Sequence, residues 1–129
     1  MHSRSMMLRL ATLAAILPAL PGIARSAEGD AQAGRTAFNR RCAACHATAA
    51  GQNKVGPSLH GVAGRPSGQV PGFNYSPAMR SANKTWDEAA LNAYLVDPKA
   101  FVPGNRMIMP GIRDEAERQN IIAYLATLR

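Results

Sequence analysis

The stretch RRCAACHAT, residues 40–48, contains both cysteines of this 129-residue chain and one of its three histidines. Cys42 and Cys45 are three positions apart, and His46 follows directly. Four kinds of site use this sequence or part of it: a disulfide, a dithiol redox centre, half of a zinc site and a covalent haem anchor. Because these sites need different surroundings, the rest of the chain discriminates between them.

The N-terminal segment has the layout of a secretory signal peptide. Arg4 and Arg9 are followed by an uncharged apolar run at residues 10–24 and then by small residues. Two prolines interrupt this run, which is shorter than the ~20 apolar residues that span a bilayer. We therefore predict export to the periplasm, removal of residues 1–27 by cleavage near residues 24–27, and no stable membrane insertion.

The remaining domain, residues 28–129, is small and moderately basic. Loss of the leader lowers the formal net charge from +7 to +4, because three arginines leave with it. This charge is modest for a nucleic-acid-binding protein, and export also argues against a nucleic-acid partner. A chain of about a hundred residues builds only a small core from side chains, so a bound prosthetic group would enlarge that core.

Hydrophobic periodicity predicts an all-α domain. The helical segments are residues 30–42, 85–97 and 114–129. Asp30 is the expected N-cap of the first, Thr85 with Glu88 form the expected capping box of the second, and Asp114 with Glu117 cap the third.

Long loops are expected between these helices. Glycine and proline recur through residues 47–75, which are expected to form a loop, and a second loop occupies residues 102–111. Pro98 either ends the second helix or begins a short new turn. No alternating run predicts a strand.

An all-α fold reduces the number of site types that the cysteine motif can form. A thioredoxin-like dithiol follows a strand, and no strand is predicted before Cys42. A zinc site needs four ligands, which Cys42, Cys45, His46 and distant His60 could supply. However, the adjacent residues Cys45 and His46 cannot easily both reach one tetrahedral ion. A disulfide would leave His46 without a role. Covalent haem attachment uses all three residues, because cysteines one helical turn apart reach two vinyl groups and the histidine then lies under the ring.

Four side chains are candidates for the second axial iron ligand: His60, Met79, Met107 and Met109. A single methionine is commonly core filler. However, the loop PGNRMIMPG has little packing reason to hold two methionines, so it is the favoured source. Residues two apart on an extended segment share a face, and spacing therefore does not separate Met107 from Met109.

Beyond these motifs, the chain resembles the class I cytochromes c. The matching segments occur in the family's order: GDAQAGRTAFNRRCAACH, GPSLHGVAGR, PGFNY, TWDEAALNAYLVDPKAFVPGNRMIMPGI and IIAYL. The resemblance implies a cytochrome c fold, with three to five helices and long loops around one covalent haem c. It also implies a respiratory electron carrier, not an enzyme. The alternatives are a small peroxidase-like haem enzyme and a fixed electron-transfer subunit of a larger complex.

The resemblance also assigns roles to individual residues. Cys42 and Cys45 would form the thioethers, and His46 and Met107 would be the axial ligands. The Pro57 carbonyl would accept the second ring N–H of His46, and Tyr94 would hydrogen-bond to the Met107 sulfur. The expected propionate partners are Arg65, Tyr75 and Trp86, with Asn105 as a possible fourth.

Further expectations from the resemblance concern packing and partners. Gly34 and Phe38 would cross the C-terminal helix near Tyr124, while Met79 and Met109 replace the asparagine and phenylalanine common in relatives. A basic face at the exposed haem edge would dock redox proteins, and the carrier would be a monomer. The residues expected on this face are Arg41, Lys54, Lys99, Arg106 and Arg113. Arg118, on the C-terminal helix, is expected to lie outside it.

Overall fold

The computed structural model describes residues 29–129, so the predicted signal peptide and its cleavage site lie outside the described residues. The helices are α1 (Ala31–Arg41), α2 (Pro77–Arg80), α3 (Glu88–Val96), α4 (Pro98–Phe101) and α5 (Glu115–Leu125). Over this range the only β pairing is an isolated bridge between Pro66 and Thr85. The prediction of an all-α fold with long loops is therefore confirmed. None of the described helices has the length and apolarity to cross a membrane.

Two of the three predicted helix starts are confirmed by their caps. The Asp30 carboxylate accepts the N–H groups of Gln32 and Ala33 at 2.8 and 3.2 Å, and so begins α1. Asp114 accepts the N–H of Glu117 at 3.0 Å and so begins α5. Each carboxylate satisfies backbone donors that have no partner within the helix.

The predicted capping box at Thr85 is wrong. Asp87 is the N-cap of α3, and its carboxylate accepts the N–H of Ala90 at 2.8 Å. The physical reason is a tertiary contact: the N–H of Trp86 donates to the carbonyl of Arg65 at 2.9 Å, beside the bridge at Thr85. This pairing holds the chain extended until Asp87, where the helix can start.

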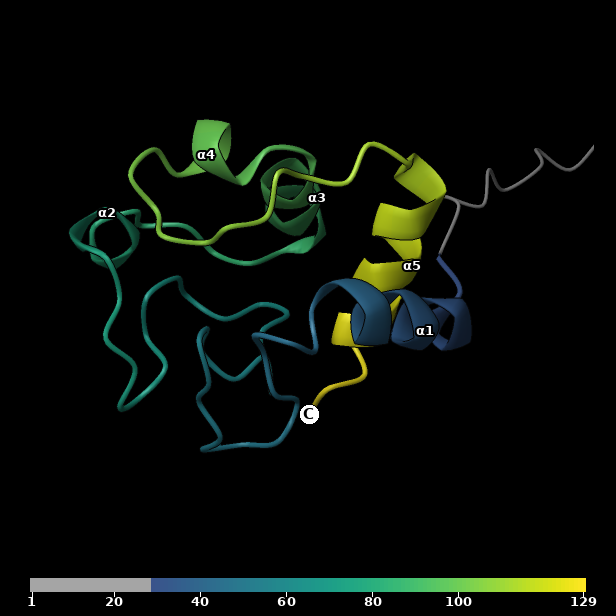
Figure 1. The fold of residues 1–129 in the computed structure, drawn as a ribbon, viewed down its shortest axis with the longest axis horizontal. Coiled ribbons are helices and arrows are strands. Elements are labelled where there is room, and N and C mark those ends of the chain that lie inside the picture. The colour runs from purple at the N-terminus through teal and green to yellow at the C-terminus, as the bar shows by residue number, and fades with distance from the viewer. Residues whose placement is uncertain (1–28) are drawn as a thin grey trace, which may run out of the picture.

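Helices α1 and α5 cross in close contact, as Figure 1 shows on the side of the molecule opposite α2 and α4. A Cβ atom at Gly34 would lie 1.8 Å from the Asn120 carbonyl oxygen, so only glycine permits this approach. Phe38 is buried, and its ring centroid lies 5.3 Å from that of Tyr124. The predicted crossing is confirmed.

A hydrophobic core joins this crossing to α3. Its buried members are Ala37, Phe38, Val62, Trp86, Leu91, Leu95, Ile112, Ile121, Ile122 and Leu125. After α3, Asp97 caps α4 by accepting the N–H of Ala100, and Pro98 takes the first position of α4. Pro98 thus begins a short new helix, which was one of the two outcomes expected for it. The loops of residues 42–75 lie below the α3–α4 layer in Figure 1.

Candidate functional site

The cysteine motif lies directly after the end of α1. The chain tightens into a turn there, because the N–H groups of Cys45 and His46 both donate to the Cys42 carbonyl, at 3.1 and 2.9 Å. Cys42 is half-buried against the core and Cys45 is exposed. The turn therefore presents two thiols and an imidazole within five residues.

The thiol of Cys42 is poorly suited to redox catalysis. Burial raises its pKa to about 11, and the nearby Arg41 charge only partly opposes this shift. A dithiol centre needs a thiolate of lowered pKa as its nucleophile. No disulfide joins Cys42 and Cys45 in the structure. The environment of Cys42 thus disfavours the dithiol reading of the motif.

The imidazole of His46 is held in one tautomer. Its Nδ1 lies 2.8 Å from the carbonyl oxygen of Pro57, and a carbonyl can only accept, so Nδ1 carries the proton. Burial lowers the pKa of His46, which favours the neutral ring. The lone pair of Nε2 is then available to a metal, and orientation by a carbonyl is typical of ligating histidines.

The sulfur of Met107 is held by the phenol of Tyr94. Tyr94 Oη donates to Met107 Sδ at 3.8 Å, and burial raises the pKa of Tyr94 to about 12, so the donor stays protonated. The N–H of Met107 donates to Asn105 Oδ1 at 2.9 Å. In turn, the Asn105 amide donates to the carbonyls of Pro98 and Val102 at 2.7 and 2.9 Å.

The other ligand candidates differ from Met107 in their surroundings. Met79 and Met109 both pack against the hydrophobic core. Ile108, which lies between the two loop methionines, is 98% exposed. The two loop methionines, which spacing alone did not separate, thus differ in their surroundings: the Met107 sulfur accepts a hydrogen bond, whereas the partly buried Met109 side chain packs against the core. The backbone carbonyl of His60 accepts a hydrogen bond from Arg65 Nη1 at 2.7 Å.

The expected propionate partners Arg65, Tyr75 and Trp86 lie close together. The N–H of Trp86 donates to the carbonyl of Arg65. Burial raises the pKa of Tyr75, and the nearby positive charge of Arg65 partly opposes this shift. The Trp86 ring lies 5.0 Å from that of Tyr94. The Arg65 guanidinium is half-buried, donates to the carbonyls of His60 and Ser58, and ion-pairs with no carboxylate within residues 29–129. A negatively charged group would suit this place.

The hydrogen bonds of the Asn105 side chain all go to the backbone of its own loop and of the adjoining α4. Both amide hydrogens are donated to backbone carbonyls, and the amide oxygen accepts the N–H of Met107. The side chain therefore shapes the loop that carries Met107. Its contact with a propionate stays a prediction.

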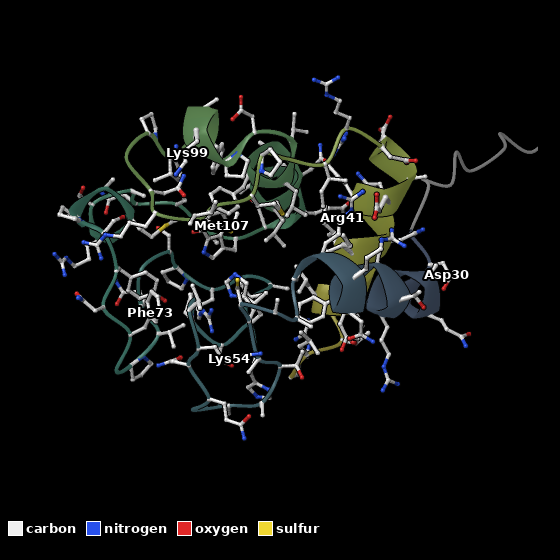
Figure 2. All side chains as sticks on the ribbon, in the orientation of Figure 1. Asp30, Arg41, Lys54, Phe73, Lys99 and Met107 are labelled. Carbon is white, nitrogen blue, oxygen red and sulfur yellow. The ribbon has the colours of Figure 1, made fainter. Side chains whose placement is uncertain are left out.

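Three of the five basic residues expected around the haem edge also make short hydrogen bonds or ion pairs within the fold. Figure 2 shows Lys99 above and Lys54 below Met107, with Arg41 near the α1–α5 crossing. Lys54 Nζ donates to the Ala43 carbonyl at 2.7 Å, and Lys99 Nζ donates to the Asn105 carbonyl. Arg41 is in a bidentate pair with Glu117, at 2.6 and 2.9 Å.

The remaining two basic residues, Arg106 and Arg113, are exposed. The Arg106 guanidinium makes one long hydrogen bond, 3.4 Å, to the Asn74 carbonyl. These two side chains therefore present charge with little involvement in the fold.

Arg118 is buried, although a charged side chain on a helix is ordinarily found at the surface. Its residue surface is only 8% exposed, and its guanidinium donates to Asn92 Oδ1 and to the carbonyls of Ile112 and Arg113, at 2.8–2.9 Å. A signal for this burial exists in the sequence, because position 118 precedes Ile121 and Leu125 by three and seven residues. It therefore belongs to the apolar face of α5.

An all-α domain that presents Cys-x-x-Cys-His at the end of a helix has the features of a c-type haem protein. Comparison with known proteins agrees. The profile of the family described as Cytochrome c matches residues 31–129. Cytochrome c-550 of Nitrobacter winogradskyi is 48% identical over 99 residues, which cover 76% of this chain and 90% of that protein. Cytochrome c of Euglena viridis is 45% identical over 101 residues, covering 78% and 99%.

A solved structure supports the same conclusion. Cytochrome cH from Methylobacterium extorquens is 46% identical, with a TM-score of 0.72, and the match covers 77% of this chain and 99% of that one. The chain belongs to the cytochrome c family, as a class I c-type cytochrome. It is accordingly a single-haem electron carrier, not an enzyme, with a covalently bound haem c. Its Cys42, Cys45 and His46 match the family's attachment sequence.

Proposed function

We propose that this cytochrome is a periplasmic electron carrier whose haem iron is ligated by His46 and Met107. The observation that carries the proposal is that both candidate ligands are oriented by a hydrogen bond. The Pro57 carbonyl fixes the His46 tautomer with Nε2 unprotonated, and the Tyr94 phenol holds the Met107 sulfur. The donor set, a neutral imidazole and a thioether, suits haem iron.

The attachment proposal rests on the turn after α1. Cys42 and Cys45 are the only cysteines of the chain, and their spacing suits two thioethers on one porphyrin edge. Cys42 packs against the core, so its thioether would anchor the group on the apolar side. Cys45, which is exposed, would form the outer bond.

The bound haem supplies one-electron chemistry, and Met/His ligation is known in cytochromes c to raise the reduction potential. The protein would hold both ligands on the iron and so leave no open position for a substrate. Pro57 and Gly56 confine His46 from one side, and Tyr94 and Asn105 confine Met107. Such confinement favours electron transfer over substrate binding at the metal.

Arg65, Tyr75 and Trp86 are proposed to hold the haem propionates, with Asn105 acting through the loop. The half-buried guanidinium of Arg65 supports this proposal, because a charge taken partly out of water is favoured by an opposite charge nearby. Replacement of Arg65 by glutamine should lower the reduction potential, since removal of a nearby positive charge favours the ferric state.

We further propose export and partner docking. Residues 1–27 would direct the chain to the periplasm, where residues 28–129 act as a monomeric domain. Acidic redox proteins would dock at the face that includes Lys54, Lys99, Arg106 and Arg113. Arg41 would contribute less, because Glu117 already neutralises part of its charge.

The test of the proposed function uses protein exported from cells that have a haem-attachment pathway. The purified chain should retain haem through acid–acetone extraction, gain the mass of one haem and show no free thiol. The oxidised protein should show the far-red sulfur-to-iron charge-transfer band. Extractable haem would overturn the attachment, and absence of the band would overturn methionine ligation. N-terminal sequencing of the same material tests cleavage near residues 24–27, and sedimentation tests the monomer.

A further inference from the structure

The side chain of Arg118 joins three parts of the fold from within the core. Its Nε donates to Asn92 Oδ1 on α3 at 2.9 Å. Its Nη1 donates to the carbonyls of Ile112 and Arg113, both at 2.8 Å. Arg118 itself belongs to α5. One planar guanidinium therefore holds α3, α5 and the end of the loop that carries Met107.

The loop of residues 102–114 is secured separately at its two ends. Asn105 holds the first end, through its bonds to Pro98, Val102 and the N–H of Met107. At the second end, the N–H of Ile112 donates to the Leu95 carbonyl at 2.8 Å, and Arg118 holds the Ile112 carbonyl. Release of either end would free the segment that bears Met107.

The second end is also where the loop presses on α3. Gly111 has a φ of +106°, and a Cβ atom there would lie 2.1 Å from the carbonyl oxygen of Val96. Helix α3 also carries Tyr94, the donor to the Met107 sulfur, two positions after Asn92. Arg118 thus ties the loop to the same helix that supplies the hydrogen bond to the sulfur.

Stability alone gives little reason for this arrangement. A buried cation is expensive unless it is paired, and within residues 29–129 Arg118 ion-pairs with no carboxylate. Its neighbours at the same face of α5, Ile121 and Leu125, show that an apolar side chain suits the position. The three hydrogen bonds of Arg118 offset part of the cost of burying its charge. They also fix the positions of the two loop carbonyls that accept them.

We propose that Arg118 is a positioning residue for the distal ligand, which keeps the loop closed so that Met107 stays on the iron. This inference rests on the Met107 ligation proposed above. Loss of the guanidinium would raise the fraction of molecules in which the loop has opened. An external ligand that competes with Met107 would then bind more tightly, in proportion to that fraction.

The experiment titrates the oxidised holoprotein with imidazole. Arg118→Met keeps the apolar stem and removes the donors, and should increase the apparent imidazole affinity on the order of tenfold. The far-red band should weaken in parallel. Arg118→Lys keeps the charge but not the planar fork, and should fall between Arg118→Met and the wild type.

The matched control is Ile121→Val, in the buried face of the same helix. It should lower global stability by about 1 kcal/mol without removing any of the hydrogen bonds that hold the loop. Its imidazole affinity and far-red band should equal those of the wild type. An equal increase in affinity for Arg118→Met and Ile121→Val would overturn the inference, because general destabilisation would then explain both.

Three other outcomes also decide the matter. A wild-type protein without the far-red band would refute Met107 ligation, and the inference with it. A wild type with the band and an Arg118→Met variant of unchanged imidazole affinity would refute the inference alone. If Arg118→Met yields no holoprotein, Asn92→Ala, which removes one of the three acceptors, should raise the affinity a few-fold, and an unchanged affinity would refute the inference.

Discussion

Gly56 lies so close to His46 that a Cβ atom at position 56 would come within 2.3 Å of the imidazole Cε1 and within 2.8 Å of both ring nitrogens. The backbone beside the proposed proximal ligand is therefore part of its orientation. The same segment provides the Pro57 carbonyl that accepts from His46 Nδ1. The backbone of Gly56 confines the imidazole ring by close contact, and the carbonyl of Pro57 fixes its Nδ1 edge.

This relationship predicts a specific effect of Gly56→Ala. The methyl group must displace the ring, because the clash involves Cε1 and both nitrogens of the imidazole and not the end of a flexible chain. We expect a loss of roughly 1–3 kcal/mol in the free energy of unfolding of the holoprotein, as in other overpacked sites. The Soret spectrum should shift as well, since the Nε2 direction changes. Denaturant unfolding and absorbance measure the two effects.

Gly51→Ala is the control for this prediction. Gly51 has a φ of +75° and no neighbouring atom within 4 Å of a Cβ placed there. Alanine should cost about 1–2 kcal/mol from backbone strain. The spectrum should not change. A spectral shift in both variants would show that strain in this loop, not contact with the ring, disturbs His46.

Met107→Ala and Met109→Ala should behave in opposite ways. Met107→Ala should abolish the far-red band and lower the reduction potential, because the Tyr94-bound sulfur is the proposed ligand. Met109→Ala should keep the band and lose roughly 1–2 kcal/mol of stability, less than a fully buried methionine, since its side chain is a partly buried part of the core. Exchanged results would assign ligation to Met109. If neither variant loses the band, His60 and Met79 become the candidates.

Local sequence signals predicted two of the three N-caps, those of α1 and α5. Asp30 and Asp114 accept hydrogen bonds from backbone N–H groups two or three residues away, so the local sequence is enough to predict their role as caps. Thr85 was misassigned because its conformation is set by a partner about twenty residues away, in the pairing of Trp86 with Arg65. Propensity does not register such contacts.

Arg118 and Lys99 show a second limit of sequence reading. A charged residue is normally placed at the surface, and the three acceptors of Arg118 are backbone and amide groups that no pattern reveals. Lys99 was predicted as a docking charge, whereas its amine also donates to the Asn105 carbonyl. In both cases the fold decides what the cation does.

Glu117 should make stability depend on acid pH. The hydrogen bond from Arg41, and then that from Arg40, lower its pKa from the ordinary 4.5. A lowered folded-state pKa means that the stabilisation is complete above the unfolded value and is lost as the pH falls below about 4.5, through the folded value. We expect Glu117→Gln to cost up to about 1 kcal/mol at pH ~7 and almost nothing at pH ~2, because ion pairs to solvent-exposed arginines such as Arg40 and Arg41 are weak.

Urea unfolding of the two holoproteins across this pH range measures the difference. Asp87→Asn is the control, because its carboxyl caps α3 by a hydrogen bond and makes no salt bridge within residues 29–129. A Glu117→Gln penalty that persists unchanged at pH ~2 would mean that packing, not the ion pair with α1, is responsible.

The last prediction concerns the docking face, where Arg106 and Arg113 are the cleanest probes. Both are exposed, whereas reversal of Lys99 would also remove its bond to the Met107 loop, and Arg118 is buried and unsuitable as a surface control. Arg106→Glu and Arg113→Glu should each slow second-order electron transfer to an acidic partner at low salt, because charge steers the encounter.

Arg35→Glu provides the matched charge reversal away from this face. Arg35 is exposed on α1, six positions before Arg41, and is not among the residues expected on the docking face. Its reversal should change the rate little. Raising the salt from about 10 to 150 mM shortens the Debye length from ~30 to ~8 Å, so the wild-type rate should fall steeply and approach that of Arg106→Glu. Stopped-flow kinetics measures each rate. A flat salt response, or equal slowing by Arg35→Glu and Arg113→Glu, would mean that the basic residues only solvate the surface.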